Sequence, residues 1–291
     1  MYRSPKQVTG SAARVASLRK QSSHKFSHGH ALVLSGPAGQ TGAARLAARG
    51  ALRIGAGVVT VASPKSAMLE NALHLTAIMV KDTDGPQALK RLLEDERINT
   101  LCLGPALGLD TRAAKLVAVA LEANRKTVLD ADALTLLSQD AGLFAKLHAG
   151  CVLTPHAGEF KRLFPDIAAK LDTPASTGPA YCKVDATREA AKRTGCTVLF
   201  KGPDTMIASP NGQASVNASL YARSAPWLAT AGSGDVLAGF ITGLLARGFT
   251  PHNAAETGAY LHTECALSFG AGLIAEDIPE ELPKVFKALG L

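Results

Sequence analysis

The sequence predicts an α/β protein with a mostly parallel sheet, covered by helices on both faces, and antiparallel strands near one edge. Short, continuously apolar segments rich in β-branched residues alternate with helical segments through most of the chain. Strands that are apolar throughout are typical of a parallel sheet buried on both faces. After residue 193 three strand-like segments follow one another with little between them, which indicates antiparallel pairing.

The expected elements follow in order along the chain. The parallel strands are expected at 31–34, 58–62, 76–80, 100–103, 127–130 and 151–153. Helices are expected between them, for example at 42–54, 111–123 and 185–193. The antiparallel strands are expected at 196–201, 205–209 and 213–217, where Asn211-Gly212 is a strong hairpin signal. Helices at 234–246, 251–270 and 280–289 complete the pattern, and the first is apolar around most of its circumference, as in a buried helix.

Composition and charge narrow the function classes. The 291 residues suffice for one large α/β domain, which we expect over 24–291. Residues 1–23 are expected to form an N-terminal extension that could be flexible. The net charge of +7 suits a polyphosphate ligand, whereas only 5% aromatic residues and no basic run interleaved with them disfavour nucleic acid. No apolar run is long enough for a membrane span. Five cysteines without CxxC spacing indicate a reducing compartment, and we expect the cytoplasm.

The most informative motif is the segment 229–239, Ala-Thr-Ala-Gly-Ser-Gly-Asp-Val-Leu-Ala-Gly. Gly232, Ser233 and Gly234 lead directly into an apolar helical pattern, and Asp235 stands at the junction. Backbone N–H groups at a helix start hold anions. A carboxylate is a poor neighbour for an anion unless it accepts a proton from an attacking hydroxyl. The motif therefore predicts phosphoryl transfer, and the chain has no G-x-x-x-x-G-K-[ST] loop.

Other turns at predicted strand ends leave two interpretations open. Gly36, Gly39 and Gly42 form a G-x-x-G-x-x-G turn that fits close approach to a phosphate or ribose better than a Rossmann fingerprint, or it is a plain tight turn. Gly104-Pro105-Ala106-Leu107-Gly108 lies where open α/β sheets bind ligands, although it could be only a turn. Asp130 and Asp132 fit either Mg²⁺ orientation through water or helix capping.

Two further segments carry candidate site residues. In Thr154-Pro155-His156-Ala157-Gly158-Glu159, Thr154 is expected as a helix N-cap, which would place His156 at the mouth of the sheet. Glu159, one turn further on, is a further candidate Mg²⁺ ligand, with exposure to solvent as the alternative. Lys201 can neutralise a phosphate, and Gly202 lets the backbone approach a nucleotide.

Taken together, these motifs resemble those of the ADP/ATP-dependent NAD(P)H-hydrate dehydratases. The resemblance extends from about residue 24 to residue 286. It rests on the order and spacing of several segments: His24-Lys25 with His28-Gly29-His30, Gly42-Ala43, Gly55-Ala56-Gly57-Val58, Gly104-Pro105 with Gly108, Asp130–Leu134, Thr154–His156 with Gly158-Glu159, Lys201-Gly202 with Thr205, and Ala229–Gly239. It implies a ribokinase-like three-layer αβα sandwich.

The resemblance also implies a repair reaction and roles for individual residues. The ring hydroxyl of (S)-NADHX or (S)-NADPHX, the hydrated cofactors, would be phosphorylated by ADP (or ATP) with Mg²⁺, and loss of phosphate would restore NADH or NADPH. Asp235 would be the base, and Gly232, Ser233 and Gly234 would cradle the phosphoryl group. The hydrated dinucleotide would contact Ala43, Gly104, His156 and Asp235. The nucleotide would be held by Lys201, Gly202, Pro203, Asp204, Thr205 and Gly234.

The sequence departs from the family pattern at a few positions, and these bear on the alternatives. Ala106 stands where a third glycine is usual, Ser233 where threonine is usual, and Arg223–Trp227 replaces a glycine-rich segment. The alternative function is a small-alcohol kinase of the same fold, for hydroxyethylthiazole or hydroxymethylpyrimidine; a non-catalytic nucleotide binder is a third. The resemblance further implies a homo-oligomer, a tetramer. Because no N-G-G-D-G motif is present, a separate epimerase is expected.

Overall fold

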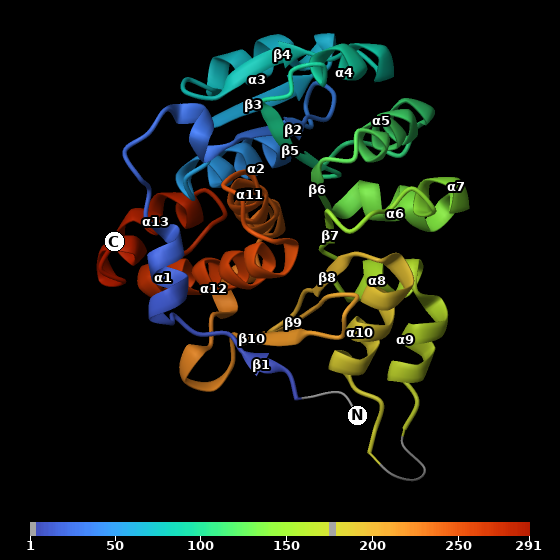
Figure 1. Ribbon diagram of the computed structural model, residues 1–291, viewed down its shortest axis with the longest axis vertical. Helices are drawn as coiled ribbons and strands as arrows, with labels where there is room; N and C mark the ends of the chain where they lie inside the picture. The colour runs from blue at the N-terminus through green and yellow to red at the C-terminus, as the bar shows by residue number, and fades with distance from the viewer. Residues whose placement is uncertain (1–3, 175–178) are drawn as a thin grey trace.

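The computed structural model describes residues 4–174 and 179–291 (Figure 1). Within them, ten strands form one sheet in the order β1-β10-β9-β8-β7-β6-β5-β2-β3-β4. The strands are β1 (Lys6–Gln7), β2 (His30–Leu34), β3 (Val58–Ser63), β4 (Met79–Asp82), β5 (Ile98–Leu103), β6 (Lys126–Leu129), β7 (Cys151–Leu153), β8 (Thr197–Phe200), β9 (Asp204–Ala208) and β10 (Ala214–Ala218).

The sheet confirms the predicted pairing. Strands β2 to β8 pair in parallel, and β9 runs antiparallel to both β8 and β10. Neighbours in the parallel part are separated along the chain by helices, because a parallel connection needs a crossover. Every residue of β2, β3, β7 and β8 is buried, as the continuous apolar runs indicated.

Helices cover both faces and make the three layers that the sequence predicted. Figure 1 shows one group on the side of the C-terminus and another on the opposite side of the sheet. The first group comprises α2 (Gly42–Arg53), α11 (Ser233–Ala246), α12 (Pro251–Phe269) and α13 (Asp277–Ala288). The second comprises α4 (Pro86–Leu92), α5 (Thr111–Glu122), α6 (Ala131–Gln139), α7 (Ala141–Phe144), α8 (Ala157–Leu163), α9 (Pro165–Leu171) and α10 (Lys183–Thr194). Each group encloses its own apolar core against the sheet.

Short elements lie outside the two groups. They are α1 (Ala12–Leu18), α3 (Met68–His74) and the 3₁₀ turns η1 (Lys25–His28), η2 (Lys65–Ala67), η3 (Tyr221–Arg223) and η4 (Pro226–Leu228). Residues 4–23 run along the domain: β1 adds to the sheet edge beside β10, and Val8 and Leu18 are buried in the core on the α12 side. Residues 1–3 of the predicted extension lie outside the described residues, and the domain boundary at residue 24 stays a prediction.

The element bounds differ most from expectation where the sequence signal is weak. The strand expected at 76–80 begins later, as Met79–Asp82, at the exposed edge of the sheet. The short helices α3, α4, α6, α8 and α9 are only two to three turns long, so their periodicity is hard to detect. No helix among the described residues is long and apolar enough to cross a membrane.

Candidate functional site

The candidate site lies where the carboxyl ends of β5 to β8 meet the N-terminus of α11. Backbone hydrogen bonds continue beyond the strands and hold their exits together. The N–H of Thr154 donates to the carbonyl of Leu129 at 3.1 Å, and the N–H of Lys201 donates to the carbonyl of Pro155 at 2.8 Å. Side chains that are far apart in the chain are therefore fixed side by side.

An ionic cluster, which we call the site cluster, occupies this place and consists of Asp130, Glu159, Lys201 and Asp235. Lys201 Nζ lies 2.7 Å from Asp130 Oδ1 and 3.8 Å from Glu159 Oε2. The hydroxyl of Thr154 also donates to Asp130 Oδ1, at 2.9 Å. Burial alone would lower the pKa of Lys201, but the charges of Asp130 and Glu159 outweigh it and raise that pKa, so the ammonium stays charged.

Asp235 differs from the other members because its carboxylate has no counter-ion of its own. It stands in the first turn of α11, and its side chain forms no hydrogen bond or ion pair with the rest of the described chain. Burial raises its pKa to about 6, the charge of Asp130 adds to that shift, and Lys201 opposes it. A carboxyl group in this state is able to exchange a proton near neutral pH.

The predicted anion loop, Gly232-Ser233-Gly234, precedes Asp235, and side chains of other helices hold it in place. Gly232 adopts a left-handed conformation (φ 84°), and a Cβ there would lie 2.6 Å from Leu46 Cδ1, so glycine is required. His262 Nε2 donates to the carbonyl of Ser233 at 2.9 Å and lies 3.2 Å from its hydroxyl. Burial lowers the pKa of His262 to about 4, so this ring is neutral. Gly234 is next to Lys201, because a Cβ on it would be 3.5 Å from Lys201 Nζ.

Helix α8 begins two residues later than the sequence indicated. His156, not Thr154, is the N-cap: its Nδ1 accepts from the N–H of Gly158 at 3.0 Å, and Glu159 Oε2 accepts from the N–H of His156 at 2.8 Å. The expected N-cap role of Thr154 is wrong because its hydroxyl is engaged by Asp130. The His156 side chain is 56% exposed, so the rest of the ring faces solvent at the mouth of the site.

The segment 201–205 forms a tight turn between β8 and β9. The hydroxyl of Thr205 donates to the carbonyl of Gly202 at 2.7 Å, while Gly202 and Pro203 are exposed. Asp204 Oδ1 is paired with Lys183 Nζ at 2.7 Å. The turn therefore has a rigid base and an open backbone edge.

The turns after β2 and β5 form the other rim. Gly104 is buried at the end of β5, and a Cβ there would meet the Asp130 carbonyl at 1.7 Å. Asp132 lies inside the first turn of α6, and its Oδ2 accepts from the N–H of Gly108 at 2.9 Å. Of its two alternatives, helix capping is therefore wrong, and the carboxylate fixes the neighbouring turn instead. Ala43 stands in the first turn of α2, which packs along α11.

Sequence analysis missed two residues of this region. His262 lies in the middle of α12, where a lone histidine in an apolar helix carries no local signal. Lys183 stands at the start of α10, and its Nζ also donates to the carbonyl of Asp204 at 3.0 Å. Both act through contacts more than 15 residues away in the chain, a separation that local pattern analysis does not reach.

The donor set limits how a metal ion could be held. Within residues 4–174 and 179–291, no group of three or more His, Cys, Asp or Glu side chains is placed to ligate a metal. Both oxygens of Glu159 already face partners, His156 and Lys201. Yet the site cluster combines three carboxylates with one ammonium, an excess of negative charge that suits a hydrated divalent cation shared with phosphates.

Comparisons with known proteins agree with this arrangement. The family Carb_kinase, NAD(P)H-hydrate dehydratase, matches residues 31–284. A bifunctional NAD(P)H-hydrate repair enzyme of Moorella thermoacetica is 36% identical over 285 residues, which cover 93% of this chain and 52% of the relative. The bifunctional NAD(P)H-hydrate repair enzyme of Synechocystis is 37% identical over 254 residues, which cover 84% of this chain and 45% of the relative. The chain thus spans about half the length of the curated relatives it matches.

Solved structures extend the comparison to the fold. The ADP/ATP-dependent NAD(P)H-hydrate dehydratase from Bacillus subtilis, co-crystallised with ATP and Mg²⁺, superposes with a TM-score of 0.78 at 27% identity, covering 98% of this chain and 99% of that one. Hydroxyethylthiazole kinase from Pyrococcus horikoshii shares the fold alone, with a TM-score of 0.60 and 13% identity over 96% of this chain and 93% of that one. On the family match and the identity to its relatives, this chain belongs to the NAD(P)H-hydrate dehydratase family and has a ribokinase-like fold.

Proposed function

We propose that this protein restores NADH and NADPH from their hydrated forms, (S)-NADHX and (S)-NADPHX, at the expense of ADP or ATP. Family membership supports the reaction class. The observation that carries the proposal is Asp235, an unpaired carboxylate with a pKa raised to about 6, at the N-terminus of α11 beside Lys201. This pairing of a base with an anion site is what transfer of a phosphoryl group to a hydroxyl requires.

The chemistry divides into two steps. Asp235 takes the proton of the ring hydroxyl as its oxygen attacks the terminal phosphorus of the donor, and AMP leaves when the donor is ADP. The C–O bond of the phosphate ester then breaks, inorganic phosphate departs with the electron pair of that bond, and the adjacent carbon loses a proton to give the reduced ring. Hydroxide is a poor leaving group and phosphate a good one, which explains why a dehydration would use kinase machinery.

The anion loop stabilises the transferring group. The N–H groups of Gly232, Ser233 and Gly234 lie at the positive end of the α11 dipole. Lys201, held charged by Asp130, adds a second positive charge beside Gly234. Because these groups are already fixed by His262 and by the strand exits, little reorganisation accompanies the transfer.

The two substrates would bind on opposite sides of this loop. On one side the turn of Lys201, Gly202, Pro203, Asp204 and Thr205, together with Gly234, offers an open backbone edge to the nucleotide. On the other side the hydrated dinucleotide would contact Ala43, Gly104, His156 and Asp235. The ring of His156 is exposed on this side, while the turn at Gly104 is buried.

Mg²⁺ would be held chiefly by the phosphates of the nucleotide. The negative excess of the site cluster fits such an ion through water, and Glu159 stays a predicted ligand of this kind. The ion would neutralise charge on the phosphates. Proton acceptance, stabilisation of the transferring phosphoryl group and substrate binding would be carried out by groups of the chain itself.

Three wider features belong to the same proposal. A homotetramer and a separate epimerase, which would convert the other epimer of the hydrate, follow from the family resemblance. The relatives are named bifunctional, and this chain spans about half of them. A cytoplasmic location is supported by the five cysteines, all of them free thiols.

The test is recovery of reduced-nicotinamide absorbance from hydrated NADH with Mg²⁺ and ADP, ATP or no nucleotide. Recovery only with a nucleotide is expected, and comparison of the two donors assigns the preference. Hydroxyethylthiazole and hydroxymethylpyrimidine serve as competing acceptors. Nucleotide consumption with these alcohols, and none with hydrated NADH, would move the protein to the small-alcohol kinases.

A further inference from the structure

The segment 219–228 connects β10 to the anion loop, and it presents large apolar side chains to solvent. Trp227, the single tryptophan of the sequence, is 49% exposed, and Tyr221 is 95% exposed. Neither side chain takes part in the reaction described above. Single exposed apolar residues are ordinary, but several gathered in one segment mark an interaction surface, and Leu220 is exposed here as well.

The segment is fixed beside the turn assigned to the nucleotide. The N–H of Ser219 donates to the carbonyl of Pro203 at 2.7 Å, and its hydroxyl lies 2.9 Å from that of Thr263 in α12. Arg223 is paired with Glu264, also in α12, at 2.6 Å. The segment therefore bridges the edge of the 201–205 turn and α12.

Trp227 belongs to this bridge, and its side chain is half-exposed. It lies in the turn η4, which packs against α12, and its neighbours Ala225 and Leu228 reach the apolar core. The indole is left outside while the backbone that carries it is anchored. Trp227 and Gly232 are five positions apart in the chain, so their Cα atoms lie within about 18 Å of each other even at full extension.

We infer that Trp227 stacks on the purine base of the nucleotide donor and sets the affinity for that donor. The inference rests on the proposed function. A nucleotide whose terminal phosphate lies at the anion loop, and whose ribose follows the 201–205 turn, carries its base to the surface bordered by the segment 219–228. An indole is the largest flat side chain, and a base has a flat face to match it.

Fluorescence of the wild-type protein tests the contact without turnover. Since Trp227 is the only tryptophan, its emission reports on this position alone. ADP and ATP are expected to quench it in a saturable way, whereas inorganic diphosphate, which has phosphates but no base, is expected to leave it unchanged. Saturation of ADP binding by calorimetry with no change in emission would overturn the inference.

Kinetics of substituted proteins separate base stacking from other roles. Trp227→Ala is expected to raise the KM for the nucleotide about 5- to 100-fold, the range of one lost stacking contact. The kcat and the KM for hydrated NADH should stay within about twofold, because the chemistry and the dinucleotide rim are elsewhere. Trp227→Phe keeps a ring and should recover most of the nucleotide affinity.

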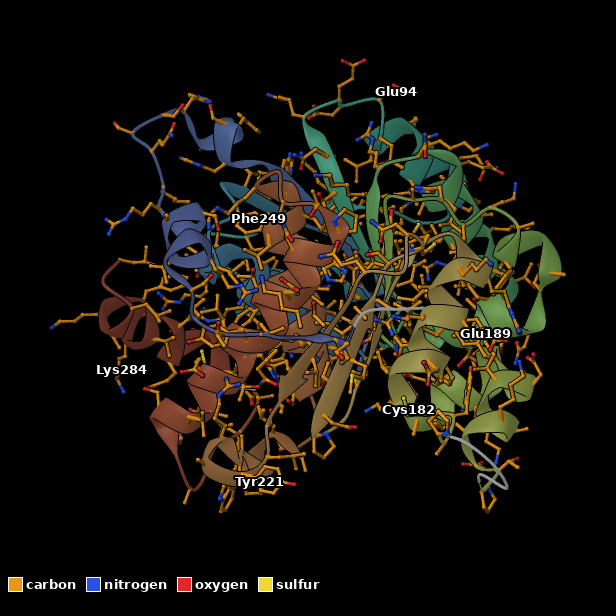
Figure 2. All side chains as sticks on the ribbon, turned by 60° about the horizontal axis from the view of Figure 1, so that its bottom comes forward. Glu94, Cys182, Glu189, Tyr221, Phe249 and Lys284 are labelled. Atoms are coloured by element: carbon orange, nitrogen blue, oxygen red, sulfur yellow. The ribbon has the colours of Figure 1, made fainter. Side chains whose placement is uncertain are left out.

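Tyr221→Ala is the matched control, since Tyr221 belongs to the same segment but lies at its outer tip, as Figure 2 shows. It should behave like the wild type. An unchanged nucleotide KM in Trp227→Ala, or a change in the KM for hydrated NADH instead, would overturn the inference. If Trp227→Ala does not fold, the kinetics of Trp227→Phe and the fluorescence titration of the wild type decide whether Trp227 stacks on the base. Failure of the dehydratase assay alone would refute the proposed function, while calorimetric and fluorescence titrations with ADP would still test the stacking.

Discussion

Two buried ionic clusters border this sheet, and they differ in how completely their charges are paired. The site cluster leaves Asp235 without a partner and its pKa raised to about 6. The second cluster, which we call the N-terminal cluster, consists of Arg14, Ser215, His252 and Glu256. There Arg14 Nη2 lies 2.8 Å from Glu256 Oε2, and His252 Nε2 lies 3.3 Å from Glu256 Oε1.

In the N-terminal cluster, both carboxylate oxygens of Glu256 and both ring nitrogens of His252 have partners. Ser215 donates to Glu256, and the other nitrogen of His252, Nδ1, lies 2.8 Å from the hydroxyl of Ser209. Burial alone would raise the pKa of Glu256, but hydrogen bonds from His252 and Ser215 outweigh it and lower that pKa to about 2. Through Arg14 the cluster ties α1 to α12.

The comparison shows what separates a structural network from a chemical one. Both clusters combine carboxylates with basic groups in a buried setting. Where every charge has a partner, a carboxylate is held ionised and the network stabilises the fold. Where one carboxylate is left over, its proton is labile near neutral pH, which costs stability and makes chemistry possible.

The largest expected effect comes from removing the unpaired charge. Asp235→Asn should lower kcat at least ~10²-fold, the lower end of general-base effects, with nucleotide affinity nearly intact. The same change should stabilise the protein. A raised pKa means that the ionised carboxylate lowers stability as pH rises through about 6, so at neutral pH the neutral amide should gain about 1–2 kcal/mol. Steady-state kinetics, calorimetry with ADP and denaturant unfolding measure these changes; wild-type activity in the variant would refute the role of Asp235.

Removing a paired charge should do the reverse. Glu256→Gln leaves the buried guanidinium of Arg14 without a counter-ion and should lower the free energy of unfolding by about 3 kcal/mol. Activity per folded molecule should be unchanged. Glu122→Gln, which breaks the exposed pair with Lys146, is the matched control and should change stability by less than about 1 kcal/mol. Equal losses of unfolding free energy in the two variants would show that the buried pair of the N-terminal cluster stabilises the fold no more than an exposed pair.

The pH dependence should separate the two clusters in the wild-type protein. As the proposed base, Asp235 would act only when ionised, so kcat/KM should fall about tenfold per pH unit below about 6. The pKa of Glu256 is lowered, so its stabilisation is fully present above about 4.5 and is lost as pH falls towards about 2. Between pH 4.5 and 6 the enzyme should therefore lose activity and keep its circular dichroism. Loss of both together would mean that unfolding, not titration of Asp235, limits activity there.

The smallest effect concerns backbone strain at the rim of the site. Ala106 has φ 52°, a left-handed conformation that costs an L-residue about 1–2 kcal/mol. Ala106→Gly should relieve it and raise the free energy of unfolding by about 0.5–1 kcal/mol, after the extra chain entropy of glycine is subtracted. Ala145→Gly, at an ordinary helical φ of −67°, is the control and should destabilise. Chemical denaturation compares the stabilities of the two variants. A loss of stability in Ala106→Gly would show that the backbone at Ala106 is not strained.

The sequence predicted what depends on neighbours in the chain. The apolar runs predicted the strands, and the glycines before Asp235 predicted the turn at the start of α11, because turn geometry and helix starts are local. The pairing of Lys201 with Asp130 was not predictable, since 71 residues separate them and only the parallel order of β6, β7 and β8 brings them together. The N-cap of α8 was placed at Thr154 because its hydroxyl suits that role, yet Asp130 engages it.

In the proposed mechanism the ring hydroxyl leaves as part of a phosphate ester, and an isotope label measures this directly. Hydrated NADH carrying ¹⁸O in the ring hydroxyl would be converted with ADP, and the phosphate and water would be analysed by mass spectrometry. The proposed mechanism predicts one ¹⁸O in each inorganic phosphate released and none in water. Unlabelled phosphate and labelled water would show that the hydroxyl leaves unphosphorylated and would contradict it.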